Sequence, residues 1–111
     1  MRRKEPRKNA NMSYIVKIHK TDDGRIFSVI IDKEIVGKKF DEGELQLDLT
    51  SPYYRGDETA EDETLKIISK SYSVSFIGED SVRLGSSKGL VDEKTALRIK
   101  GIPVIHAMVF V

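Results

Sequence analysis

The sequence lacks cysteine, which excludes disulfide bonds and metal sites built on thiolates. Long hydrophobic runs are also missing, since the closing stretch from Ile102 to Val111 is about half of the roughly 20 residues that a membrane-spanning helix needs. No apolar stretch follows the basic N-terminus in the manner of a signal peptide. These absences fit a reducing compartment, and we expect a cytoplasmic protein.

Side chains that commonly carry catalysis are scarce. His19 and His106 are the only histidines, and neither has a second histidine or a cysteine at the spacing of zinc ligands. The glycine-rich stretch 78–89 lacks the P-loop signature, because Lys88 is followed by Gly89 instead of Ser or Thr. We therefore predict a protein that is not an enzyme, has no catalytic residues and holds no metal or cofactor.

The residues present suffice for one folded domain preceded by a charged tail. The chain has 111 residues, of which 39% are hydrophobic and 33% charged, and its net charge is +1. Residues 1–11 contain five basic residues and one acidic residue, a net charge of +4, which leaves −3 for residues 12–111. Because no core-forming side chain precedes Met12, we predict a basic disordered tail at 1–11 and one α+β domain at 12–111.

Alternating apolar and polar residues predict strands. Tyr14 to Lys20 and Ile26 to Asp32 are joined by the turn sequence 21–24, which predicts a β-hairpin. Leu45 to Leu49 alternates in the same way and predicts a half-buried strand. The stretch from Ile102 to Val111 is apolar on both faces when extended, which predicts a strand inside the sheet. Whether loops or a partner cover its second face stays open.

Two segments carry helix signals. Thr59 has the spacing of an N-cap residue within the acidic run 57–63, so a helix is predicted to begin there. This position accounts for the acidic run without a catalytic role. A short strand is predicted at 71–77, and a second helix from Glu79 to Lys88 with Gly89 as its C-cap residue.

These elements predict an α+β fold. We expect a single domain with a mixed or mostly antiparallel sheet, two helices on one side and the C-terminal strand in a central position. On such a strand His106 is expected to be buried and hydrogen-bonded. His19, at the edge of the hairpin, is expected to be exposed, and neither histidine is expected to form a site.

The tail and two loops contain the candidate binding residues. Closely spaced cations without core-forming side chains suit phosphate contacts that weaken with salt. The loop 50–56 combines two tyrosines with an arginine, which suits stacking on unpaired bases, and a predicted loop at 37–43 adds two lysines. The alternative is that one tyrosine packs into the core beneath its loop. The predicted RNA-binding residues are Arg2, Arg3, Lys4, Arg7, Lys8, Lys38, Lys39, Tyr53, Tyr54 and Arg55.

Several short motifs are distributed over residues 12–111. They comprise Tyr14, Val16, Lys17 and His19; Val36, Gly37, Lys38, Phe40, Glu42 and Gly43; Ile77, Gly78, Glu79, Val82, Arg83 and Leu84; Gly89, Leu90, Val91 and Asp92; and Leu97, Arg98, Ile99, Gly101, Ile102 and Pro103. In these motifs the sequence resembles an archaeal family of small proteins known as domain of unknown function 424. It departs from the family pattern at one point, because Val104 and Ile105 separate Pro103 from a histidine that directly follows the proline in the family.

The resemblance implies a compact α+β domain in an archaeal cytoplasm and brings no established activity with it. It points loosely to translation, which makes ribosomal RNA the first candidate partner. The leading hypothesis is an RNA-binding accessory protein of the archaeal translation machinery, either ribosome-associated or a small ribosomal protein. We expect a monomer by itself or a part of a larger assembly with ribosomal proteins, and no membrane partner.

Two other functions stay open. The acidic body of residues 12–111 suits a protein-interaction module that binds a basic translation factor. A small enzyme acting on a nucleotide or metabolite would use Gly78, Glu79 and Arg83, at a predicted helix N-terminus, as an anion site.

Overall fold

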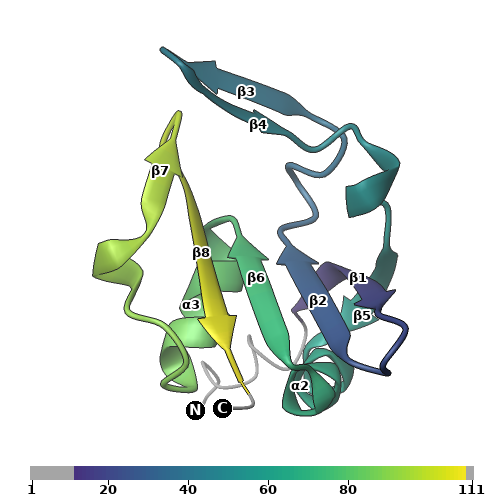
Figure 1. Cartoon of the computed structure of the whole chain (residues 1–111). Helices are drawn as coiled ribbons and strands as arrows, with labels where there is room; N and C mark the ends of the chain where they lie inside the picture. The colour runs from purple at the N-terminus through teal and green to yellow at the C-terminus, as the bar shows by residue number, and fades with distance from the viewer. Residues whose placement is uncertain (1–11, 110–111) are drawn as a thin grey trace.

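A six-stranded sheet with two helices on one face forms the body of the protein (Figure 1). The computed structural model describes residues 12–109, and the predicted tail at 1–11 lies outside them. The strands are β1 (Ser13–Lys20), β2 (Ile26–Ile31), β3 (Lys39–Glu42), β4 (Leu45–Asp48), β5 (Asp57–Ala60), β6 (Ser73–Ile77), β7 (Leu97–Ile99) and β8 (Ile102–Met108). The helices are α2 (Glu61–Lys70) and α3 (Glu79–Ser87), with 3-10 turns η1 (Pro52–Tyr54) and η2 (Glu93–Thr95).

The sheet is mixed, with the strand order β5-β1-β2-β6-β8-β7. β2 and β6 run parallel, because the long connection between them contains α2, and every other neighbouring pair is antiparallel. The predicted α+β class with a mixed sheet and two helices is therefore confirmed. β8 has a strand on each side, as expected of an interior strand, and β2 and β6 form the middle pair.

The helices cover one face of the sheet and bury the main core there. Val74 and Phe76, on the middle strand β6, are fully buried in this core together with Ile30 of β2. α2 contributes Ile68 and α3 contributes Val82. Burial of each such side chain is worth about 1.5–3 kcal/mol, which fixes the helices on this face. Neither helix within residues 12–109 is long and apolar enough to cross a bilayer.

The second predicted helix is confirmed as α3, and its predicted C-terminal cap at Gly89 is confirmed as well. The amide of Gly89 donates to the carbonyl of Ser86 at 3.0 Å, and the amide of Leu90 donates to the carbonyl of Gly85 at 3.0 Å. This pair of bonds is a Schellman motif, which satisfies the last carbonyl groups of a helix. Leu90 folds back against the main core.

The first helix begins later than predicted. Thr59 belongs to β5, where it pairs with Tyr14 of β1, and α2 starts at Glu61 with Ala60 as its N-cap residue. The prediction failed because pairing with the edge of the sheet holds residues 57–60 extended, which a local capping pattern does not report.

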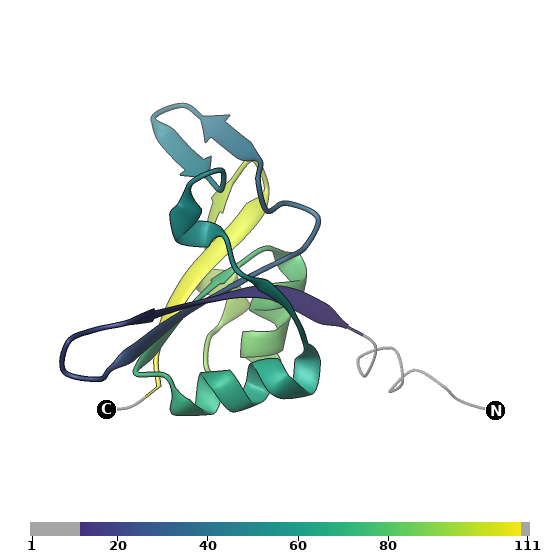
Figure 2. The same cartoon turned by 90° about the vertical axis from the view of Figure 1, so that its right-hand side faces the viewer.

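The predicted loop at 37–43 is wrong over much of its length, because Lys39–Glu42 forms β3. This strand pairs with β4, so that Phe40 lies opposite Leu47. Both side chains pack into a second hydrophobic cluster with Leu49, on the sheet face opposite the helices. Figure 2 shows this β3–β4 hairpin and α2 at opposite ends of the molecule. The strand escaped prediction because Phe40 is its only apolar residue.

Candidate nucleic-acid interface

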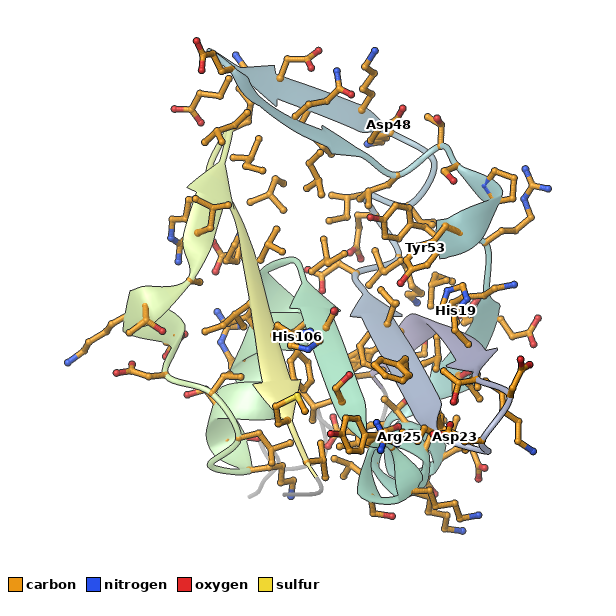
Figure 3. The ribbon with its side chains drawn as sticks, viewed as in Figure 1. His19, Asp23, Arg25, Asp48, Tyr53 and His106 are labelled. Carbon is orange, nitrogen blue, oxygen red and sulfur yellow. The ribbon has the colours of Figure 1, made fainter. Side chains whose placement is uncertain are left out.

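The sheet face opposite the helices has an accessible part away from the β3–β4 hairpin, which we call the open face. Strand registers place two rows of side chains across β1, β2, β6 and β8, and alternation along each strand directs them away from the helices. One row is His19, Phe27, Ser73 and Met108, and the other is Lys17, Val29, Ser75 and His106. Figure 3 labels both histidines. None of the eight residues is acidic.

Tyr53 lies over one end of the open face, stacked on His19. Their ring centroids are 4.0 Å apart and the ring planes differ by 16°. The Nε2 atom of His19 also donates a hydrogen bond of 3.1 Å to the Tyr53 carbonyl oxygen. Tyr53 is nevertheless 50% exposed. The pair therefore presents an aromatic surface to solvent, and His19, predicted to be exposed, is half-buried beneath the tyrosine.

The loop that carries Tyr53 is held by its own hydrogen bonds. The Ser51 hydroxyl accepts from the amide of Tyr53 at 3.1 Å, and the amide of Arg55 donates to the carbonyl of Pro52 at 3.0 Å. Pro52 restricts the backbone at the first position of η1. The position of Tyr53 is thus set before any ligand binds.

The neighbouring Tyr54 has a different surrounding. It is half-buried and packs against the second hydrophobic cluster, with its ring edge-on to Tyr53 at 5.0 Å. Burial raises the pKa of Tyr54, and the nearby Tyr53 and Asp48 raise it further. Of the two tyrosines left open by the sequence, Tyr54 anchors the loop and Tyr53 faces solvent.

The basic residues predicted for this site, Lys38, Lys39 and Arg55, are all exposed. The amide of Leu49, just before the Tyr53 loop, donates to the carbonyl of Lys38 at 2.8 Å, so Lys38 and Lys39 flank the start of that loop. Arg55 follows its end and lines a shallow hollow of about 260 Å³ together with Lys17 of the open face. The three predicted cations thus lie next to the two ends of the loop that carries Tyr53.

His106 lies at the other end of the open face, on β8. The prediction that it is a buried core residue is wrong, because its side chain is exposed. Its Nδ1 atom is hydrogen-bonded to the hydroxyl of Ser75 on β6, 2.9 Å away. The β3–β4 hairpin covers the part of this sheet face that holds Val104, whereas the next outward residues of that face, His106 and Met108, extend beyond it.

Ser73 lies between the two ends of the open face. Its neighbours in the row are Phe27 on β2 and Met108 on β8. The Ser73 side chain is 1% exposed, and its hydroxyl has no hydrogen-bond partner among the described residues. A buried hydroxyl without a partner is uncommon and costs stability, so a hydrogen-bonding group that reached Ser73 would gain a bond there.

A family model described as "Protein of unknown function (DUF424)" matches residues 19–110. The chain belongs to the DUF424 family. No curated protein matches it. The crystal structure of an uncharacterized conserved protein from Methanopyrus kandleri is similar over 89% of this chain and 93% of that chain, with a TM-score of 0.74 and 18% sequence identity. At this identity the likeness establishes a shared fold.

An acidic cluster lies on the helix side of this DUF424 protein. One carboxylate oxygen from each of Asp32, Glu34 and Asp80 falls within 4.8 Å of the others. Both oxygens of Asp32 already accept hydrogen bonds from the N-terminus of α3, at the amides of Asp80 (3.0 Å) and Ser81 (2.8 Å). The predicted anion site at this helix N-terminus is thus filled by a carboxylate of the chain itself.

A hollow of about 440 Å³ adjoins this cluster in the DUF424 protein. Tyr14, Glu61, Asp80 and Arg83 supply its polar lining. Burial raises the pKa of Tyr14 well above its usual value, and the carboxylates of Glu61, Asp80 and Asp32 add to the rise. Arg83 forms an exposed salt bridge of 3.3 Å with Asp80. The polar groups of the hollow are thus engaged with one another.

Sequence reasoning missed several residues of the open face. Phe27, Ser73, Ser75 and Met108 come from three strands that are distant in sequence, and only their registers align them. Alternation within β6 does place Ser73 and Ser75 on the face opposite Val74, which is the one signal available from the sequence.

Proposed function

We propose that this protein is an RNA-binding accessory protein of the archaeal translation machinery, ribosome-associated or a small ribosomal protein, and not an enzyme. The observation that supports RNA binding best is the exposed Tyr53 ring held on His19. An aromatic face open to solvent stacks on an unpaired base, a contact worth about 1–3 kcal/mol. The placement of the RNA in translation, with ribosomal RNA as the first candidate, carries over the expectation from the sequence resemblance, because the family model itself is described only as a protein of unknown function.

The arrangement of the loop favours such a contact. Because the 3-10 turn and the Ser51 hydrogen bond already hold Tyr53, little side-chain freedom is lost when a base stacks on it. Lys38, Lys39 and Arg55 form no salt bridge within residues 12–109, although the charge of Lys39 acts on Asp48, which lies opposite it in the β3–β4 hairpin. A phosphate would therefore compete with Asp48 for Lys39. The predicted tail cations lie outside the described residues and would add contacts of the same kind.

Substitution of Tyr53 tests the stacking contact. Fluorescence anisotropy with a labelled oligouridylate should show about 5- to 150-fold weaker binding for Tyr53→Ala, the range expected from the loss of one stacked base. Tyr53→Phe, which keeps the ring, should bind like the natural protein. Leu97→Ala is the matched control, because Leu97 is 52% exposed and lies on the far edge strand β7. Equal affinity of Tyr53→Ala and the natural protein would exclude Tyr53 from the site.

Sedimentation of the endogenous protein tests the translation partner. A gradient of cell lysate should show co-migration with a ribosomal particle that is lost with nuclease or with high salt. Association that survives nuclease and removal of the tail would instead support a basic translation protein as the partner of the acidic body. Migration as a free small protein under all conditions would contradict the translation assignment.

A further inference from the structure

We propose that the open face holds a second nucleotide next to the one on Tyr53, so that a single RNA strand crosses the sheet from β1 to β8. This inference rests on the proposed RNA-binding function. At about 4.8 Å between neighbouring strands, β1 and β8 are roughly 14 Å apart on this face. A sheet of four strands with aromatic side chains is known to stack two or three bases over such a width.

The row from His19 to Met108 supplies the contacts of the second base. Phe27 is the next residue after His19 in this row, and its half-buried ring packs against Tyr72, with centroids 5.7 Å apart. Met108, at the end of the row, is 48% exposed and offers a flexible thioether that adapts to a flat base. Ser73 between them is 1% exposed, so a base would lie above it on the outer surfaces of Phe27 and Met108.

Polar groups of the right kind border the same position. The unpartnered Ser73 hydroxyl lies in the row between Phe27 and Met108 and can donate to, or accept from, a base edge. The hydrogen-bonded Ser75 and His106 lie in the next row. These groups can form hydrogen bonds with a base or a ribose when the flexible Met108 side chain changes its rotamer and uncovers Ser73.

The two rows of the open face contain no negatively charged side chain, which suits an anionic strand. Residues 12–111 carry a net charge of −3, yet no carboxylate occurs in the two rows. Lys17 is the positively charged residue of these rows. A polyanion therefore meets no carboxylate within the two rows themselves. The carboxylates that border the rows are Asp22 and Asp23, which share a hollow with Phe27, and Asp57, which shares one with Lys17.

Oligonucleotide length separates the two nucleotide positions. For the combined variant His106→Ala/Met108→Ala, affinity for a hexauridylate should fall at least about fivefold, while affinity for a diuridylate bound at Tyr53 stays within about twofold. Tyr53→Ala should weaken both. Leu45→Ala is the matched control, because Leu45 is 42% exposed and begins β4, outside the open face.

The variant Ser73→Ala separates a binding role of the hydroxyl from a structural one, because RNA affinity and Tm are measured side by side. Removal of an unpartnered buried hydroxyl should leave Tm unchanged or higher, whereas the affinity for the hexauridylate should still fall. Suppose that Ser73→Ala and His106→Ala/Met108→Ala both bind the hexauridylate like the natural protein, while Tyr53→Ala binds it more weakly. This result would overturn the proposal of a second nucleotide position and leave the proposed function intact. Absence of RNA binding by the natural protein would overturn both. Binding of a basic peptide to the open face in place of RNA would also overturn the second nucleotide position.

Discussion

Asp32 caps the N-terminus of α3 although it lies far from this helix in the sequence. It follows β2, and its carboxylate accepts from the amides of Asp80 and Ser81 and from the Ser81 hydroxyl, at 2.7–3.0 Å. The N-cap position of α3 is Gly78, which has a φ of 111°, and a Cβ atom there would lie 2.3 Å from the Asp32 carboxyl carbon. Glycine thus makes room for a cap that arrives from a distant strand.

Replacement of Asp32 tests this cap. Asp32→Ala leaves the buried Ser81 amide and hydroxyl and the Asp80 amide without partners, and the free energy of unfolding should fall by about 2–4 kcal/mol. Urea unfolding followed by circular dichroism measures the change. Asp92→Ala is the control, because Asp92 caps the exposed three-residue turn η2 and should cost below about 1 kcal/mol. An equal cost for both variants would show that Asp32 is not a significant cap.

At the scale of elements, two hairpin tips meet above the sheet. The β7–β8 turn consists of Lys100 and Gly101, whose φ values of 53° and 80° are those of a type I′ turn. The Lys100 amide donates to the Glu42 carboxylate at the end of β3, 2.6 Å away. This contact ties the β3–β4 hairpin to the sheet beside the second hydrophobic cluster.

The turn can be improved without loss of that contact. Lys100→Asn creates the Asn-Gly pair preferred in type I′ turns and keeps the backbone amide, so it should stabilise the protein by about 0.5–1 kcal/mol. Thermal unfolding should show a Tm higher by several degrees, at about 4–8 °C per kcal/mol for a domain of this size. Lys100→Val, with a branched side chain at positive φ, should lower Tm. A lower Tm for Lys100→Asn would contradict the turn assignment.

At the scale of the whole molecule, positive charge concentrates at one end of the chain. The tail carries +4 and residues 12–111 carry −3, while Lys38, Lys39 and Arg55 are exposed at the two ends of the Tyr53 loop on the acidic body. Under the proposed function, the tail cations and these three residues contact the phosphates of one RNA.

Deletion of residues 1–11 tests the contribution of the tail. Binding to single-stranded RNA should weaken, and the slope of log K against log salt should become shallower by up to about 3, because single strands release about 0.7 counterions per neutralised phosphate. Tm should not fall, because no core side chain is removed. A variant with the five basic tail residues replaced by serine should behave like the deletion. An unchanged salt slope would exclude the tail from the RNA contact.

Local patterns predicted the elements whose side chains alternate strongly. The β1–β2 hairpin, the strand at 73–77 and the end of α3 at Gly89 follow from periodicity and turn chemistry within a few residues. β3 did not, because its pairing depends on the contact of Phe40 with a distant cluster. Among the site residues, Lys38, Lys39 and Arg55 lie exposed, as expected of residues in loops, whereas the choice between Tyr53 and Tyr54 was left open.

The sequence by itself determined the α+β class, the presence of two helices, the β1–β2 hairpin and the separation of charge between tail and body. These depend on short-range periodicity and on composition, which the linear chain contains in full. Only the tertiary structure decided which tyrosine faces solvent, that His106 is exposed, and that residues of four strands form one open face. The physical reason is that strand registers and the coverage of a sheet arise from contacts between residues far apart in the chain.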